Sequence, residues 1–143
     1  MYRSSIKRLI EWKTKPNRKP LILQGARQVG KTWIALEFGR CEFSEIAHVV
    51  FLDNEPMKTV FEGSLSPERL LSAISTETGA RAGDPDVLVI FDEVQECPRA
   101  LTSLKLFCEQ RPDVPIIAAG SLLGVTMHEG VSFPVGKVDH LDL

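Results

Sequence analysis

Apolar residues along the chain gather in short runs that are separated by segments of helical spacing. Four almost entirely apolar runs cover residues 21–24, 47–52, 87–91 and 116–119, and each has the length of a single β-strand. A strand that is apolar at nearly every position is typical of a parallel sheet covered on both faces. A fifth segment, 137–143, alternates between apolar and polar residues. The pattern predicts an α/β domain with a mostly parallel sheet and helices on both faces.

Helices are predicted between these strands, at residues 4–13, 31–38, 67–76 and 98–111. Ser66 and Pro67 form a strong helix start, since serine is a favoured N-cap and proline fits the first helical position. Gly39 is predicted to end the second helix as its C-cap. Residues 57–65 are predicted to be irregular or weakly helical.

The first strand leads into a glycine loop that ends in Gly30-Lys31-Thr32, in the pattern G-x-x-x-x-G-K-[ST]. The glycines let the backbone turn tightly, so that its N–H groups and the following helix N-terminus can surround an anion. Lys31 supplies a positive charge for the β- and γ-phosphates, and Thr32 supplies a hydroxyl ligand for Mg²⁺. The predicted nucleotide-binding residues are Gly25, Ala26, Arg27, Gln28, Val29, Gly30, Lys31 and Thr32.

The third apolar run ends in two carboxylates, Asp92 and Glu93. We expect Asp92 to lie at the carboxyl edge of the sheet and to hold Mg²⁺ opposite Thr32. Because side chains alternate along a strand, Glu93 is predicted to point to the other side. There it could orient and deprotonate a water molecule that attacks the γ-phosphorus. A nucleotide kinase would need the loop but not this second carboxylate, so Glu93 favours hydrolysis.

Ser121 follows the fourth strand and is a candidate sensor that hydrogen-bonds the γ-phosphate or the attacking water. An ordinary Gly-Ser turn is the alternative. Gln95 could reach the water or a neighbouring subunit, and Arg99 and Lys137 could act at a subunit interface, but a plain surface role is favoured for all three. The histidines His48, His128 and His140 show no metal-like spacing, and we interpret His48 and His140 as strand residues.

Composition places the chain among ordinary cytoplasmic proteins. Its 143 residues suffice for one domain with a real core, and 43% of them are apolar and 25% charged. No apolar run approaches the length of a membrane span. The three scattered cysteines fit a reducing compartment rather than a disulfide framework or a zinc site.

The net charge of −2 conceals a basic N-terminal segment. Residues 1–19 carry seven basic residues against Glu11 alone. Such a segment could contact nucleic acid, but the solvated face of a helix beside the core is the favoured interpretation. The acidic remainder of the chain argues against a dedicated nucleic-acid binder.

The residues Gly-Ala-Arg-Gln-Val-Gly-Lys-Thr at 25–32 and Phe-Asp-Glu-Val-Gln at 91–95 resemble the AAA-type P-loop ATPases of bacteria and archaea that carry an uncharacterised C-terminal domain. Further similar stretches lie at residues 2–12, 19–23, 119–123 and 132–137. The resemblance implies a three-layer P-loop NTPase fold with sheet order 5-1-4-3-2. It also implies that Glu93 is the catalytic carboxylate.

The resemblance further implies that residues 1–143 are the N-terminal ATPase core of a longer protein, without its helical lid and C-terminal domain. The first hypothesis is ATP hydrolysis with Mg²⁺ that drives or switches the missing domain, with a DNA or protein client and a homo-oligomer as possible partners. The alternative is a nucleotide-gated DNA- or protein-binding module with little turnover. No N-K-x-D motif is present to read guanine, which favours ATP over GTP.

Overall fold

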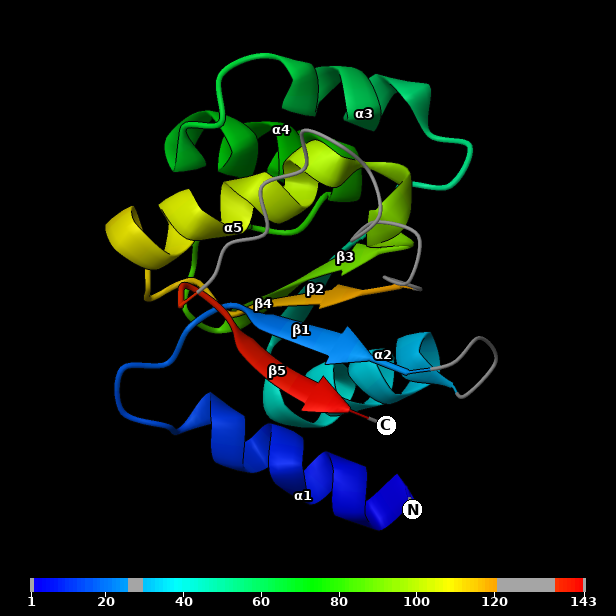
Figure 1. Cartoon of the computed structure of the whole chain (residues 1–143), viewed down its shortest axis with the longest axis vertical. Helices are drawn as coiled ribbons and strands as arrows, with labels where there is room; N and C mark the ends of the chain where they lie inside the picture. Colours follow the sequence, from blue (N-terminus) through cyan, green and yellow to red (C-terminus); the bar gives the residue numbers. More distant parts are fainter. Residues whose placement is uncertain (1, 26–29, 121–135, 143) are drawn as a thin grey trace.

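The computed structural model describes residues 2–25, 30–120 and 136–142 of the chain. Helices and strands alternate along most of this part (Figure 1). The helices are α1 (Tyr2–Lys13), α2 (Lys31–Glu42), α3 (Glu55–Glu62), α4 (Pro67–Thr78) and α5 (Pro98–Gln110), with a short 3₁₀-helix, η1, at Val94–Glu96. The strands are β1 (Leu21–Gln24), β2 (Glu45–Val50), β3 (Val87–Asp92), β4 (Ile116–Ala119) and β5 (Asp139–Asp142).

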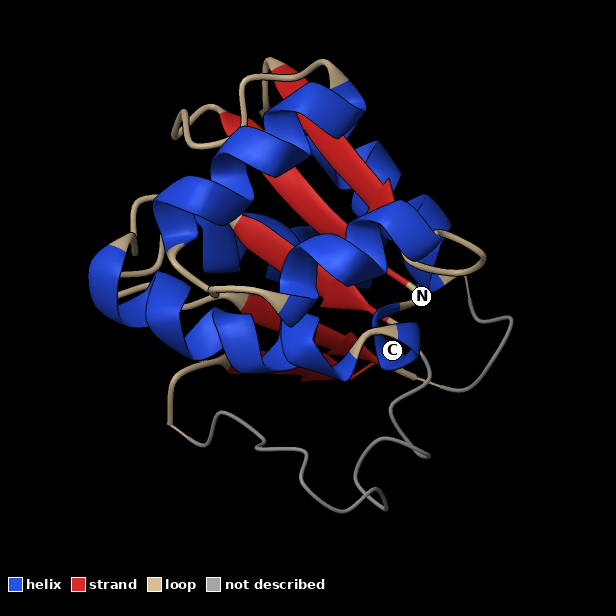
Figure 2. Ribbon diagram, turned by 90° about the horizontal axis from the view of Figure 1, so that it is seen from above, coloured by secondary structure: helices blue, strands red, loops and turns tan. Residues whose placement is uncertain are grey.

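These strands form one parallel sheet in the order β2-β3-β4-β1-β5. Counted from the other edge, this is the order 5-1-4-3-2, so the predicted fold class is confirmed. Helices α1 and α2 lie on one face of the sheet, and α3, α4 and α5 lie on the other (Figure 1). Seen from the side of α3 to α5, the helices cover the strands of the sheet (Figure 2). Since all strands point the same way, the carboxyl ends of β1 and β3 meet at one edge, where ligands bind in open α/β sheets.

Each face of the sheet has its own buried apolar cluster. On the face of α3 to α5, the rings of Phe51, Phe61 and Phe91 meet edge to face, with centroids 5.3, 5.6 and 5.7 Å apart. On the other face, Trp12 of α1 lies against Phe38 of α2 with ring centroids 6.3 Å apart. All six residues of β3 are buried between the two clusters. This double burial explains the continuous apolar run, and it fixes the position of the carboxylate with which the strand ends.

The prediction that Gly39 ends the second helix is wrong, because α2 continues to Glu42. Gly39 is buried inside the helix, where a Cβ atom would lie only 2.8 Å from side-chain atoms of Ile46 and 3.0 Å from Leu88. Glycine is therefore needed here for the close approach of the helix to the sheet. Sequence alone does not distinguish this role from a C-cap, because both favour glycine.

The second strand lies at Glu45–Val50, two residues earlier than the predicted 47–52. Its bounds follow from pairing with β3, which begins with Glu45 opposite Val87. The apolar run continues past the last paired residue, so its composition could not reveal where the strand ends.

Helix α3, at Glu55–Glu62, begins two residues before the segment 57–65 that was predicted to be irregular or weakly helical, and it covers most of that segment. Its N-terminus is capped by Asn54, whose side-chain oxygen accepts a hydrogen bond of 3.3 Å from the N–H of Met57. The cap satisfies one of the backbone donors that a helix N-terminus leaves unpaired, which stabilises a short helix.

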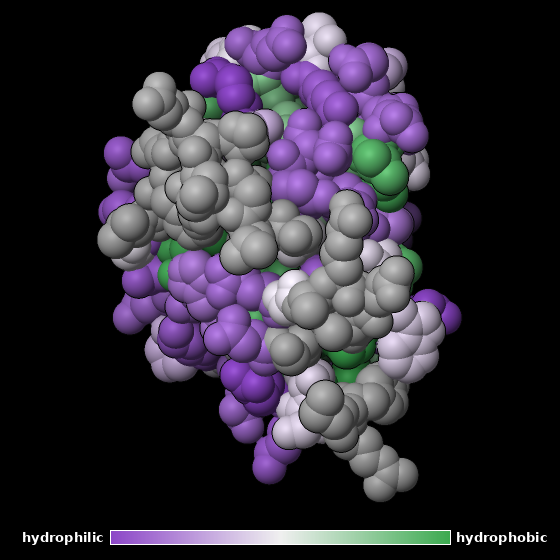
Figure 3. Space-filling view, turned by 45° about the vertical axis from the view of Figure 1, so that its right-hand side comes forward, coloured by the Kyte–Doolittle hydropathy of each residue, from purple (hydrophilic) through white to green (hydrophobic). Residues whose placement is uncertain are grey.

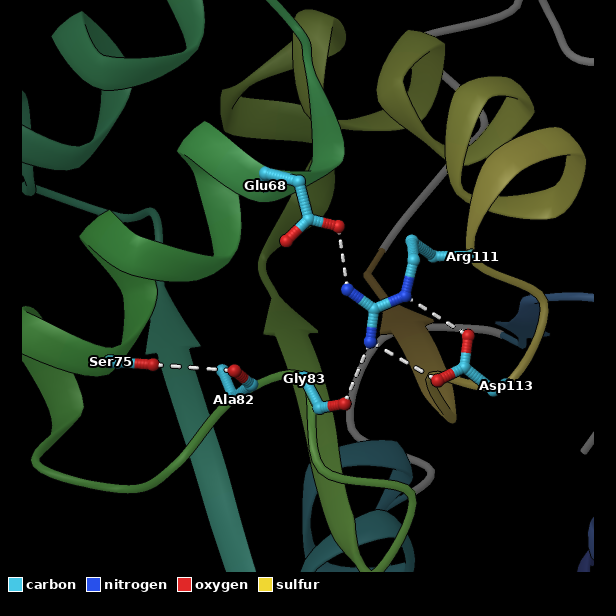
Figure 4. A network of polar contacts seen from close by, with 6 residues as sticks. All are labelled: Glu68, Ser75, Ala82, Gly83, Arg111 and Asp113. Atoms are coloured by element: carbon cyan, nitrogen blue, oxygen red, sulfur yellow. Dashed lines mark hydrogen bonds and ion pairs between the residues drawn. The ribbon is translucent and has the colours of Figure 1, made fainter.

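Arg111 joins three segments at the end of α5 (Figure 4). Its guanidinium donates to Glu68 at 2.6 Å, to the carbonyl oxygen of Gly83 at 2.9 Å, and to both carboxylate oxygens of Asp113 at 3.1 Å. The hydrogen bonds from Arg111 hold the pKa of Asp113 below its usual value. One side chain thus connects α4, the loop before β3 and the turn before β4.

Replacing Arg111 by methionine is expected to lower the free energy of unfolding by about 1–3 kcal/mol, because hydrogen bonds to charged groups are lost. The pKa of Asp113 is lowered in the folded state, so ionised Asp113 contributes to the free energy of unfolding at neutral pH. This contribution is lost as the pH falls through the lowered pKa. The difference between wild type and variant in urea unfolding should therefore shrink at acidic pH. Arg81→Met is the control, since Arg81 is exposed and lies 3.7 Å from Glu45. A difference that does not depend on pH would contradict the role given to Asp113.

The described surface is largely hydrophilic on the face seen in Figure 3, where hydrophobic residues show only in small separate areas. No helix in the described part of the chain is long and apolar enough to cross a membrane.

Candidate phosphate-binding and hydrolytic site

A pocket of about 530 Å³ lies at the carboxyl edge of the sheet, between the start of α2 and the ends of β3 and β4. Its lining residues are Gly30, Lys31, Thr32, Trp33, Leu52, Asp92, Glu93, Gln95, Glu96 and Gly120. Half of them were predicted as site residues from two motifs that are far apart in sequence. The fold thus brings the glycine loop and the carboxylate pair to one cavity.

The described ends of the glycine loop are Gly25 and Gly30. Gly30 has φ 77°, in the left-handed region that favours glycine, and it directly precedes α2. The loop residues Ala26, Arg27, Gln28 and Val29 lie outside the described residues, so their predicted contacts with nucleotide stay predictions.

Lys31 is the first residue of α2 and is largely buried, at 9% exposure. Its Nζ donates a hydrogen bond of 3.0 Å to the carbonyl oxygen of Gly25, across the loop. The ammonium group thus lies at the loop and beside the helix N-terminus, where the helix dipole already favours an anion.

Thr32 and Asp92 are in direct contact although they come from different elements. The Thr32 hydroxyl donates to Asp92 Oδ1 at 2.9 Å, and the same oxygen accepts the N–H of Glu93 at 2.9 Å. Burial of the Asp92 carboxyl acts to raise its pKa, but hydrogen bonds from His48, Thr32 and the Glu93 N–H hold that pKa below its ordinary value. Asp92 is therefore an oriented, ionised carboxylate.

His48 is the residue that sequence reasoning missed. Its Nε2 lies 2.9 Å from Asp92 Oδ2, so the imidazole occupies the second oxygen of the carboxylate. His48 is indeed a strand residue, as predicted, but in β2 it pairs with Ile90, two positions before Asp92 on the same face of the sheet. A polar residue within an apolar strand was the available signal. The register between strands, which turns this signal into a contact, is not visible in the sequence.

The prediction that Glu93 points to the other side of the strand is wrong, because β3 ends at Asp92. Glu93 has φ 54°, in the left-handed region, and it opens η1 rather than continuing the strand. Both carboxylates consequently line the same pocket. The Glu93 side chain accepts a hydrogen bond of 2.6 Å from Nε2 of Gln95.

Of the other predicted candidates, one lies outside the described residues and two make contacts elsewhere in the chain. Ser121, the predicted sensor, lies outside the described residues. Arg99 donates to the carbonyl oxygens of Phe61 and Gly63 at 2.6 and 2.9 Å, and Lys137 lies 3.4 Å from Glu109. Both cations therefore make contacts within the chain, away from the pocket.

A parallel sheet, a glycine loop that opens a helix, and an aspartate at the end of β3, which β4 separates from β1, define a P-loop NTPase class of protein. A family model described as an AAA domain matches residues 17–143, and the chain belongs to this family. The match includes both halves of the site. The comparison with curated proteins finds no significant match.

Solved structures resemble the whole chain. A Walker-type ATPase of Pyrococcus abyssi matches with a TM-score of 0.58 and 16% identity, over 99% of this chain and 53% of the other. PCH-2 of C. elegans matches with a TM-score of 0.43 and 18% identity, over 99% of this chain and 40% of the other. The chain thus spans about half the length of the Pyrococcus protein. At this identity the first likeness supports the fold alone.

Proposed function

We propose that this AAA domain binds ATP and hydrolyses it to ADP and phosphate with the help of Mg²⁺. The observation that carries the proposal is the 2.9 Å contact between Thr32 and Asp92, which are 60 residues apart in sequence. It joins a hydroxyl at the end of the glycine loop to a buried carboxylate at the end of β3. Lys31 and Glu93 line the same pocket, so a cation, a hydroxyl and two carboxylates lie together there.

The donor set fits Mg²⁺, since a carboxylate and a hydroxyl are hard oxygen ligands. Thr32 and Asp92 are the residues that would hold the ion, directly or through its water ligands. When bound, Mg²⁺ neutralises charge on the phosphate oxygens. Lys31 would turn from the Gly25 carbonyl to the β- and γ-phosphates, and the loop residues 25–30 would donate backbone N–H groups to them.

Glu93 is proposed as the general base that orients a water molecule and accepts its proton as the water attacks the γ-phosphorus. Its pocket also contains the start of the segment that bears Ser121, because Gly120 lines the wall. Ser121 is retained as the proposed sensor of the γ-phosphate.

We further propose that residues 1–143 are the N-terminal ATPase core of a longer cytoplasmic protein. A helical lid and a C-terminal domain would follow, and turnover would drive or switch that domain. The support is the family membership and the fact that the chain covers about half of the Pyrococcus ATPase.

The alternative, a nucleotide-gated DNA- or protein-binding module with little turnover, finds no added support in the described contacts. Its basis was the basic segment at residues 1–19. Within it, Lys13 donates to the Glu42 carbonyl at 2.6 Å, Lys15 pairs with Asp139 at 2.8 Å, and Arg18 donates to the Asp113 carbonyl at 3.1 Å. These three cations connect the N-terminal segment to the rest of the domain.

Replacing Asp92 by asparagine tests the proposed function. We expect the Mg²⁺ concentration needed for half-maximal phosphate release to rise by about tenfold or more, since a charged oxygen ligand is lost. ATP binding measured without Mg²⁺ should be weakened far less. Asp86→Asn is the matched control, because Asp86 is exposed in the turn that directly precedes the same strand. An unchanged Mg²⁺ dependence of the Asp92 variant would contradict the proposal.

A further inference from the structure

Gln95 lies in the middle of η1, two residues after the proposed general base. Its amide Nε2 donates to Glu93 Oε2 at 2.6 Å. Its other amide atom, Oε1, is buried and has no hydrogen-bond partner among the described residues. Proteins rarely bury an amide oxygen without a partner, because its desolvation is then uncompensated. A buried unsatisfied acceptor beside a site therefore requires an explanation.

The orientation of this amide follows from its partner. The contact joins the amide nitrogen of Gln95 as donor to a Glu93 carboxyl oxygen as acceptor, so the NH₂ group of Gln95 faces Glu93. The amide oxygen is thereby directed to the opposite side, toward Gly120 at the end of β4. A Cβ atom on Gly120 would overlap this oxygen and lie 2.9 Å from the backbone nitrogen of Val94. The Gln95 side chain thus fills the space between Glu93 and the end of the neighbouring strand.

The backbone beneath Gln95 is firmly held. The N–H of Glu96 donates to the Glu93 carbonyl and that of Cys97 to the Val94 carbonyl, both at 3.0 Å. The Val94 side chain is fully buried, and Cys97 is 5% exposed. Glu93 itself lies beyond the strand in a left-handed conformation, so strand pairing does not orient its side chain. Among the described residues, Gln95 makes the hydrogen bond that orients the Glu93 side chain.

We propose that Gln95 is a positioning residue for hydrolysis. Its amide restricts rotation of the Glu93 carboxylate and leaves the other oxygen, Oε1 of Glu93, to accept a proton from water. Its packing against Gly120 aligns that carboxylate with the end of β4. The inference rests on the proposed ATPase function, and it explains the buried oxygen as the consequence of presenting the NH₂ group to Glu93.

The test replaces Gln95 by methionine, which keeps the length of the side chain and removes the donor, and by alanine as a second variant. In the full-length protein, both changes should lower kcat for ATP hydrolysis by about 10- to 100-fold, a typical effect of a slightly misplaced catalytic group. The KM for ATP should stay within about twofold, since Gln95 is proposed to act on Glu93 rather than on the nucleotide. Gln110→Met is the matched control, on an exposed site at the end of α5.

Two further measurements separate positioning from a structural role. In a Glu93→Gln background, the Gln95 changes should have no further effect on kcat, because Gln95 acts through Glu93. The midpoint of thermal unfolding of Gln95→Met should be unchanged or raised, since a buried unsatisfied oxygen is removed. A structural role predicts the reverse, with additive losses of kcat and a lower midpoint.

The outcomes distinguish the two proposals. Equal phosphate release by wild type and Glu93→Gln would overturn the proposed function and this inference with it. A loss in Glu93→Gln together with an unchanged or raised kcat in both Gln95 variants would overturn the positioning role alone. Additive losses would show that Gln95 acts independently of Glu93 and would also overturn it.

Discussion

Replacing Glu93 by glutamine is expected to lower the rate of ATP hydrolysis by about 10²–10⁴-fold, the usual contribution of one general base. Affinity for ATP should be nearly unchanged. The reason is that different elements carry the proposed binding and catalytic groups. Lys31 and Thr32, proposed to bind phosphate and Mg²⁺, begin α2, while Glu93, the proposed base, follows β3. Glutamine keeps the size of the side chain and removes its ability to accept a proton. The variant should therefore bind ATP and fail to turn it over.

The measurement compares phosphate release with equilibrium binding of a fluorescent ATP analogue in the full-length protein. Glu62→Gln is the control, since Glu62 is exposed at the end of α3 and outside the pocket. If Glu93→Gln hydrolyses ATP at the wild-type rate, another group is the base. If it loses binding and hydrolysis together, the assigned separation of tasks is wrong.

Replacing Lys31 by alanine should weaken ATP binding by about 10- to 100-fold, because a charge-assisted hydrogen bond to phosphate contributes about 1.5–3 kcal/mol. Hydrolysis should be lost as well, since Lys31 is also proposed to stabilise charge on the γ-phosphate. Lys31 is largely buried and its ammonium lies 3.0 Å from the Gly25 carbonyl, so it is already close to the phosphate loop. Less of its side-chain freedom is then lost when nucleotide binds.

A comparison of ligands makes this prediction specific. The lysine is proposed to contact the β- and γ-phosphates, so affinity for AMP should change little while affinity for ATP falls. Titration calorimetry with both nucleotides measures the difference, and Lys105→Ala, at an exposed position of α5, is the control. Equal losses for AMP and ATP would mean that Lys31 supports the fold of the loop rather than the phosphates.

Much of the fold was predictable because its signals are local. The strands 21–24, 87–91 and 116–119 were found within one residue, since burial on both faces demands an unbroken apolar run. The helix from Pro98 was found because proline at its start and another after its end mark its limits. The order of the strands was predicted from the resemblance to a family. The pattern of apolar residues along the chain does not reveal which distant strands pair with each other.

Some features of the candidate site were likewise predictable from local sequence, and others depend on contacts between distant segments. The sequence by itself determined the two motifs of the candidate site, the glycine loop and the Asp92-Glu93 pair, because each motif is contiguous and its spacing is the one expected for binding phosphate and Mg²⁺. Only the tertiary structure decided that His48 contacts Asp92 and that Gln95 holds Glu93 beside Gly120. These contacts depend on strand register and on the left-handed turn at Glu93, which are set by packing between segments far apart in the chain.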